Sequence, residues 1–264
     1  MITLKNSMQI EKMRVAGKML YDVLGELRAA IRPGVTTLHL DSLAHKLITS
    51  MGAQPTFLGV KGLYTPYPYT LCCSVDDMIV HGFPNDQSLK EGQILSIDCG
   101  LMYQGWQSDS AFTVGIGEID DAKRQLIEVT EQCFWRAFKV ACVGNRLGDI
   151  ANAVQTHAEA HGYGVIRDMC GHGIGREMHE DPSVPNFGRA GHGLKLRHGM
   201  TIAIEPMIAM GDWHGTLDSN GWGFRTADHS ACSHYEHTIA ILDEGPQVLS
   251  MPEAEVQKAL EGVS

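Results

Sequence analysis

The spacing of apolar residues predicts helices in the first part of the chain. Between about residues 7 and 30, apolar side chains recur with a period near 3.6, which is typical of an amphipathic helix: Ile10, Met13, Val15, Met19, Leu20, Val23, Leu24 and Leu27. The sequence RPG at residues 32–34 ends this helix, and TTLHLDSLAHKLITSM predicts a second helix that ends at Gly52. Two more helices are expected at about residues 121–141 and 147–161.

Alternation of apolar and polar residues predicts strands after each pair of helices. Residues 93–115, QILSIDCGLMYQGWQSDSAFTVG, alternate around a central Gly105, which predicts two strands joined by a short turn. Two later strands are expected in MTIAIEP, residues 200–206, and in HYEHTIAIL, residues 234–242. Helices followed by strands predict an α+β fold.

The order of elements repeats, which predicts two similar halves. GVTTLHLDSLAHKLITSMG, residues 34–52, and GNRLGDIANAVQTHAEAHG, residues 144–162, have equal length and are offset by 110 positions. LKEGQILSID and LRHGMTIAIE are offset by 107 positions and end on Asp98 and Glu205. We therefore predict a single domain over residues 1–264, with pseudo-symmetric helix-helix-strand-strand halves at about 8–118 and 119–250 and a site between them.

Composition narrows the class of protein. The 264 residues are 44% apolar and 20% charged, as expected of a globular chain with a sizeable core. Acidic residues outnumber basic ones, 31 against 21, which argues against nucleic-acid phosphate binding as the main activity. Seven cysteines without CxxC spacing fit a reducing compartment. Because no signal-like segment and no run of 18 apolar residues occurs, we expect a cytoplasmic protein that does not associate with membranes.

Four carboxylates stand in apolar, strand-like runs where a plain β-core would have valine or isoleucine: Asp98, Asp109, Glu205 and Glu236. Buried unpaired carboxylates are costly, and several together cannot all ionise without a compensating cation. Asp98 and Asp109 flank the expected turn, so a hairpin can place them on one face. With one imidazole, the set suits two ions of Mn, Fe or Co better than a thiolate zinc site. Each acid alone fits a solvated strand residue, whereas the four together favour a metal centre.

The glycine-rich segment CGHGIGREMHEDP, residues 170–182, carries two histidines. His172 and His179 are seven positions apart, which is about 10 Å along a helix and about 23 Å along a strand. The two rings can share one ion only if the chain doubles back. We therefore expect the two histidines to have different roles.

Six motifs resemble those of type I methionine aminopeptidases, and the similarity runs from about residue 10 to residue 249. They are HGFP at His81, IDCG at Asp98, SDSAF at Asp109, GHGIGREMHEDP, IEPM at Glu205 and YEHT at Glu236. The resemblance implies a pita-bread fold with two divalent metal ions between its halves, Mn, Fe or Co, with Zn as a further option. It implies five metal ligands, of which Asp109 and Glu236 bridge the two ions: Asp98, Asp109, His172, Glu205 and Glu236.

The resemblance also implies an activity, the removal of the amino-terminal methionine from nascent proteins and peptides whose second residue is small. In this class, a hydroxide held between two metals attacks the peptide carbonyl. By resemblance, Glu205 accepts the proton of the attacking water, His179 faces the carbonyl and His81 lies beside the scissile amide. The implied walls of the substrate pocket are Tyr67, Cys72, Met178 and Trp222, with Phe57 nearby.

Some positions depart from the family pattern. The loop before Tyr67 carries extra residues, and Val60 or Lys61 stands where a histidine and an aromatic residue are usual. Asp76 and Cys232 replace the usual asparagine and serine near a site where relatives bind a monovalent cation through the backbone. We therefore expect the pocket shape and the dependence on a monovalent cation to differ from the family pattern.

Other readings fit the sequence less well. Prolidases and Xaa-Pro aminopeptidases usually carry a large preceding domain, whereas the first catalytic helix is expected within about ten residues of Met1. Type II methionine aminopeptidases insert a helical subdomain where only 26 positions separate His179 from Glu205. A non-enzymatic binding protein would have lost metal ligands, and all five are present. We expect a monomer that acts on nascent amino termini, with transient ribosome contact and without sequence-specific nucleic-acid binding.

Overall fold

The structure is a computed structural model, and it describes residues 2–262. Within this range the helices are α1 (Ser7–Ala30), α2 (Thr37–Ser50), α3 (Asp121–Val140), α4 (Leu147–Ala160) and α5 (Glu253–Glu261). The longer strands are β2 (Leu71–Val75), β4 (Ile94–Tyr103), β5 (Trp106–Gly115), β8 (Glu180–Val184), β9 (Met200–Ile204), β14 (Glu236–Leu242) and β15 (Gly245–Val248). No helix among residues 2–262 is both long and apolar enough to cross a membrane.

The remaining strands are short. They are β1 (Gln54–Pro55), β3 (Met78–Val80), β6 (Gly164–Val165), β7 (Gly171–Gly173), β10 (Met207–Ala209), β11 (Gly215–Leu217), β12 (Phe224–Thr226) and β13 (Cys232–His234). Apart from the last residue of β13, His234, which falls in the segment expected as one strand over residues 234–242, these short strands were not predicted, and neither was α5. The α+β class and the four longer helices are as predicted.

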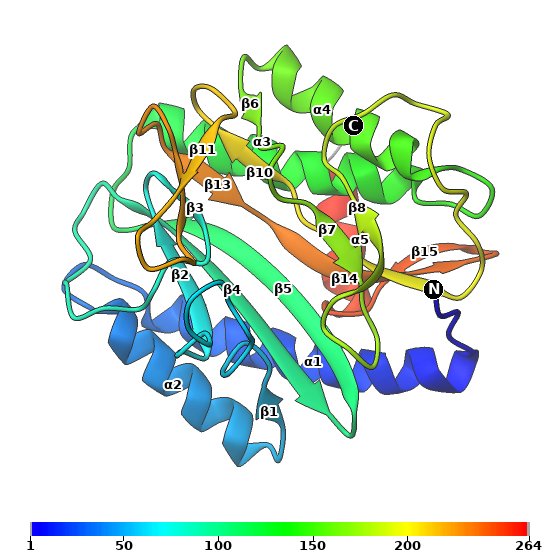
Figure 1. Ribbon diagram of the computed structural model, residues 1–264, viewed down its shortest axis with the longest axis horizontal. Helices are drawn as coiled ribbons and strands as arrows, with labels where there is room; N and C mark the ends of the chain where they lie inside the picture. The colour runs from blue at the N-terminus through cyan, green and yellow to red at the C-terminus, as the bar shows by residue number, and fades with distance from the viewer. Residues whose placement is uncertain (1, 263–264) are drawn as a thin grey trace.

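One nine-stranded antiparallel sheet organises the molecule (Figure 1). Its strands follow the order β1-β4-β5-β14-β9-β7-β8, with β2 beside β4 and β15 beside β14. Two three-stranded sheets, β13-β10-β6 and β11-β12-β3, complete the fold. Because β5 from the first half pairs with β14 from the second, the main sheet continues across the junction.

The two halves share backbone detail as well as element order. In each half, two helices precede the long strands: α1 and α2 before β4 and β5, and α3 and α4 before β9 and β14. Gly34 and Gly144, at equivalent positions of the sequence repeat, both have positive φ, 89° and 98°. Their amides donate to the carbonyls of Leu89 and Leu196 at 2.8 and 3.1 Å. The predicted pseudo-symmetry is therefore present in the backbone.

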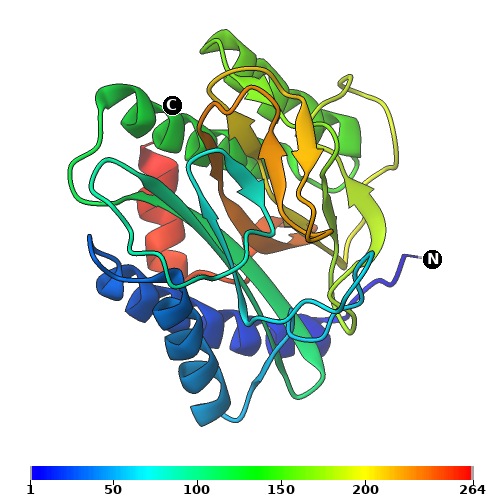
Figure 2. The ribbon, with the colours of Figure 1, turned by 60° about the vertical axis from the view of Figure 1, so that its left-hand side comes forward.

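Each half has its own apolar core. In the first half, α1 and α2 pack on β4 and β5, and in the second half α3 and α4 pack on β9 and β14. Figure 2 shows these helix pairs at opposite ends of the molecule, α1 and α2 in blue and α3 and α4 in green. The apolar spacing grouped Val15 with the residues of the buried face of α1, and that prediction is wrong. Val15 is 45% exposed, because it lies off the stripe of α1 that Met13, Ala16 and Leu20 bury.

The middle of α1 tolerates no side chain at Gly17. A Cβ atom there would lie 2.0 Å from the carbonyl oxygen of Leu249. We expect Gly17→Ala to destabilise the protein by roughly 1–3 kcal/mol, because the backbone of Leu249 must move. Gly25 on the same helix faces open space, so Gly25→Ala should stabilise by roughly 0.5–1 kcal/mol. Urea unfolding followed by circular dichroism measures both variants, and equal effects would contradict the close approach.

Candidate metal centre

The β4–β5 hairpin places two carboxylates on one face of the sheet. Ile97 and Cys99 belong to the core beneath α1 and α2, so Asp98 between them points to the opposite face. In the register, Asp98 pairs with Ala111 and Gly100 pairs with Asp109, which makes the two aspartates diagonal neighbours. The turn at Gln104 and Gly105 has positive φ at both residues, 50° and 74°, as short hairpin turns require. The hairpin around Gly105, with both acids on one face, is confirmed.

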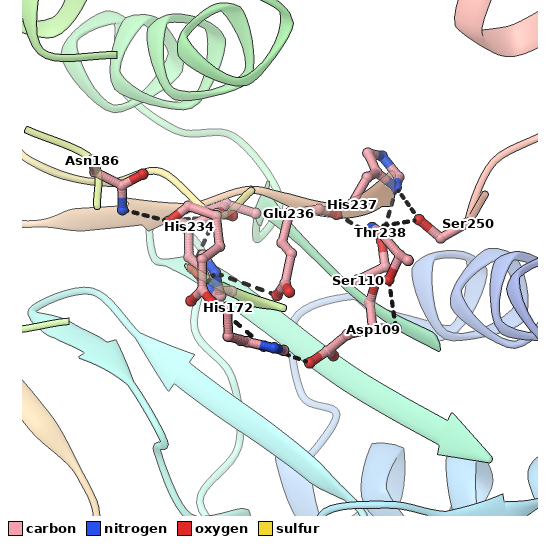
Figure 3. Close-up of polar contacts among 12 residues, drawn as sticks. Asp109, Ser110, His172, Asn186, His234, Glu236, His237, Thr238 and Ser250 are labelled. Carbon is pink, nitrogen blue, oxygen red and sulfur yellow. Dashed lines mark hydrogen bonds and ion pairs between the residues drawn. The ribbon is translucent and has the colours of Figure 1, made fainter. Parts of the chain in front are cut away.

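The second half brings further donor side chains to the same place, and Figure 3 shows His172 and Glu236 beside Asp109. Glu236 opens β14 opposite Ala111 of β5, and Glu205 directly follows β9. His172 lies in β7, and its Nε2 is 3.6 Å from Asp109 Oδ2 and 3.7 Å from Glu205 Oε1. One donor atom from each of Asp109, His172 and Glu236 lies within 4.8 Å of the other two. Side chains far apart in the sequence therefore converge on one point.

The carboxylates lie in surroundings that disfavour their ionised forms. Burial raises the pKa of Asp98, Glu205 and Glu236 well above their usual values, and neighbouring carboxylates add to each rise. Burial raises the pKa of Asp109 to about 7. Within the described chain, Asp98 Oδ1, Asp109 Oδ1 and Glu236 Oε1 are buried without a hydrogen-bond partner. Oxygen atoms left in this way need a cation, so the donor set fits divalent metal ions.

A hydrogen bond fixes which ring nitrogen of His172 faces the carboxylates. Its Nδ1 lies 2.9 Å from the carbonyl oxygen of Gly173 and donates its hydrogen there. The lone pair of the neutral ring is then on Nε2, the atom that faces Asp109 and Glu205. Burial lowers the pKa of His172, which favours this neutral form. The ring is therefore prepared to bind a metal.

The sequence model of metallopeptidase family M24 matches residues 11–243. The chain belongs to this family. Methionine aminopeptidase of Clostridium perfringens is 49% identical over 251 residues, covering 95% of this chain and 99% of the relative. Methionine aminopeptidase 1 of Bacillus subtilis is 38% identical over 250 residues, covering 95% and 99%.

Solved structures show the same fold as this M24 chain. The crystal structure of methionine aminopeptidase from Thermotoga maritima has a TM-score of 0.91 and 42% identity, covering 96% of this chain and 100% of that one. The prolidase from Pyrococcus horikoshii has a TM-score of 0.76 at 20% identity, and this chain covers 64% of its length. The predicted pita-bread fold is confirmed.

A cavity of about 70 Å³ lies above the carboxylates of this M24 peptidase. Its walls hold all five predicted metal ligands and most of the predicted substrate residues: Phe57, Tyr67, Cys72, His81, His179 and Trp222. Val60 also lines the cavity. Met178 does not, because it is buried against Phe57 and Gly100. Met178 therefore supports the wall from behind.

His172 and His179 come together because the chain does double back between β7 and β8. The two ring centroids are 4.5 Å apart. Burial, with a contribution from the neighbouring His172, lowers the pKa of His179 to about 4. Burial, with a contribution from His179, also lowers the pKa of His81 to about 4. Both rings are therefore neutral near pH 7 and each has one N–H to donate.

The loop before Tyr67 is held over the cavity by Trp222. The indole Nε1 donates to the carbonyl oxygen of Thr65 at 2.9 Å. A Cβ atom at Gly62 would lie 2.3 Å from the indole, so loop and ring are in close contact. The rings of Tyr67 and Trp222 are 5.0 Å apart, edge to face. This loop thus forms part of the cavity mouth, with Lys61 exposed beside it.

The two other departures from the family pattern meet in space. The amide of Cys232 donates to the carbonyl oxygen of Asp76 at 2.8 Å. The carboxylate of Asp76 accepts from the amide of Ile94 and from the side chain of Gln93, and it lies 3.4 Å from Lys123 Nζ. The negative charge of Asp76 is therefore paired with an ammonium group.

Sequence reasoning missed one residue of the cluster, His234. Its Nε2 lies 3.7 Å from Glu205 Oε2 and 3.7 Å from Glu236 Oε2 (Figure 3). Burial, with a contribution from His81, lowers the pKa of His234 to about 3. The available signal was spacing, since His234 precedes Glu236 by two positions in an extended segment and so shares its face.

Proposed function

We propose that this M24 peptidase is a methionine aminopeptidase that removes the first residue of nascent proteins and peptides whose second residue is small. The observation that carries the proposal is the position of the carboxylate cluster at the floor of a small cavity with aromatic and thiol walls. The names of the relatives at 38–49% identity support the same activity.

We assign the metal ligands as Asp98, Asp109, His172, Glu205 and Glu236. Mn, Fe or Co, with Zn as a further option, fits an oxygen-rich set with imidazole. Ions held by these residues would supply Lewis acidity, lowering the pKa of a water and polarising the substrate carbonyl. Unsatisfied oxygens of Asp98, Asp109 and Glu236 support this assignment.

The chain's own groups supply proton transfer and orientation. Glu205 directly follows β9 and its high pKa suits it to accept the proton of an attacking water. His179, neutral near pH 7, donates an N–H to the carbonyl oxygen as negative charge develops there. His81 lies beside the scissile amide and orients it. The wall formed by Tyr67 and Cys72 receives the methionine side chain.

We also propose a domain organisation, an oligomeric state and a cellular location for the enzyme. Residues 1–264 form one catalytic domain with halves at about 8–118 and 119–250, supported by the β5–β14 pairing across the junction. We further propose a monomeric cytoplasmic enzyme that contacts the ribosome transiently. A monovalent cation is assigned near the backbone of Asp76 and Cys232, because the two segments meet there.

Methionine release tests the activity. Purified protein loaded with Mn²⁺ is given a mixture of Met-Ala-Ser and Ala-Pro-Ala, and a chelated sample serves as the control. We expect free methionine alone, lost on chelation. Release from the Xaa-Pro peptide instead would keep the metal centre and overturn the substrate assignment. No release from either peptide would overturn the aminopeptidase function.

A further inference from the structure

The imidazole of His234 is held rigidly against the carboxylate cluster. The backbone of His234 is fixed on both sides by Thr113, whose Oγ1 accepts from the His234 amide at 3.0 Å and donates to its carbonyl at 2.8 Å. His234 also pairs with Met207 in the β10–β13 ladder. Only 1% of the residue is exposed. The ring therefore has little freedom to turn away from the carboxylates.

The ring nitrogen that faces the cluster has no partner of its own. Among residues 2–262, Nε2 is buried and makes no hydrogen bond. It lies 3.7 Å from an oxygen of Glu205 and 3.7 Å from an oxygen of Glu236, which is too long for a hydrogen bond. A buried polar nitrogen without a partner is costly, so an unpaired nitrogen at this position indicates a functional role.

Those separations fit donors that share a metal ion. Two donors bound to one ion by bonds of about 2.1 Å lie at most about 4.2 Å apart. One donor atom each from Glu205, His234 and Glu236 lies within 4.8 Å of the other two. This group is separate from the one around His172, and the two groups have only Glu236 in common. The five assigned ligands include one imidazole, that of His172. His234 places a second imidazole at the same cluster.

We propose that His234 is a sixth metal ligand, which gives the centre a second imidazole nitrogen. The assignment rests on the metal centre of the proposed function, but not on methionine as the substrate. Nitrogen donors favour Fe²⁺, Co²⁺, Ni²⁺ and Zn²⁺, whereas carboxylates alone suit Mn²⁺ equally well. His234 therefore shifts the metal preference of this chain away from Mn²⁺.

Metal titration of the purified full chain tests the assignment. Co²⁺ and Mn²⁺ affinities are measured by competition with a chelating dye for the wild type, His234→Ala and His234→Gln, and the visible spectrum of each Co²⁺-loaded protein is recorded. His39→Ala is the control, because this histidine is exposed on α2 and belongs to neither donor group. Thermal melting of the metal-free proteins shows whether each variant is folded.

For His234→Ala, we expect Co²⁺ affinity to fall by about 100-fold or more. Replacing a residue that only contacts a metal ligand typically lowers metal affinity by about 10- to 100-fold. The fall in Mn²⁺ affinity of this variant should be roughly tenfold smaller than its fall in Co²⁺ affinity. The Co²⁺ spectrum should change in both His234 variants and stay constant in His39→Ala. Glutamine keeps an amide oxygen near the position of Nε2, so His234→Gln should recover part of the Mn²⁺ affinity.

Two results would overturn the assignment in different ways. An unchanged ratio of Co²⁺ to Mn²⁺ affinity, together with an unchanged Co²⁺ spectrum in folded His234 variants, excludes direct ligation while leaving the proposed centre intact. A wild-type protein that binds neither ion removes the metal centre itself, and the sixth ligand with it. Peptide hydrolysis is not needed for either conclusion.

Discussion

Replacing Glu205 by glutamine is expected to lower the rate of methionine release by roughly 10²- to 10⁴-fold, the usual contribution of a positioned proton acceptor. Glutamine has nearly the same shape as glutamate, and its oxygen can still contact a metal, but its amide cannot take a proton. The loss should therefore fall on kcat more than on KM. Steady-state kinetics of the Mn²⁺-loaded variant on Met-Ala-Ser measures both constants.

Glu118→Gln is the matched control for this experiment. Glu118 is exposed in the segment before α3, so its replacement removes one negative charge from the same protein without reaching the site. Its kinetics should equal those of the wild type. A Glu205→Gln enzyme that loses less than tenfold in kcat, with its metal content unchanged, would show that another group accepts the proton.

Replacing Asp109 by asparagine should abolish activity and, at pH 8 without metal, make the folded protein more stable. Asp109 is buried, with 3% of the residue exposed, lies beside Asp98, and has one carboxylate oxygen without a hydrogen-bond partner. Removing a buried charge of this kind should raise the free energy of unfolding by roughly 1–3 kcal/mol. Active sites commonly show this exchange of stability for function.

Chemical unfolding in the presence of a chelator measures the change in the free energy of unfolding of the metal-free protein. The same measurement with Mn²⁺ gives the stabilisation by bound metal. Metal binding stabilises the folded wild type, by about 2.7 kcal/mol at a hundredfold excess over Kd, and Asp109→Asn should lose much of that gain. Asp22→Asn, at an exposed position of α1, is the control and should change neither value. A metal-free Asp109→Asn protein less stable than the wild type would mean that the carboxylate holds the apo fold together.

The parts of the fold that depend on short stretches of sequence could be predicted. The hairpin around Gly105 needs only alternation and a turn, and that is enough to place Asp98 and Asp109 on one face. The pseudo-symmetry was visible because equivalent glycines, such as Gly34 and Gly144, occupy positive-φ positions in both halves. Val15 shows the limit, since its side chain is apolar but its angle on the helix turns it to solvent.

The features that depend on distant segments could not be read from the chain. His234 lies by Glu205 because β14 pairs with β9, where His237 is opposite Ile204, and no local pattern encodes that register. In the same way, Trp222 closes the cavity by contacting Thr65, from which 157 positions separate it. Family resemblance located the motif residues, whereas the spacing of His234 from Glu236 indicates a shared face but not the contact with Glu205.

The order in which the donors occur along the chain has a consequence for biosynthesis. Asp98 and Asp109 are translated early, whereas Glu236, which both donor groups share, is translated after the others. A growing polypeptide that has not yet produced β14 can complete neither group. Each donor group therefore becomes complete only when the segment that forms β14 has been synthesised.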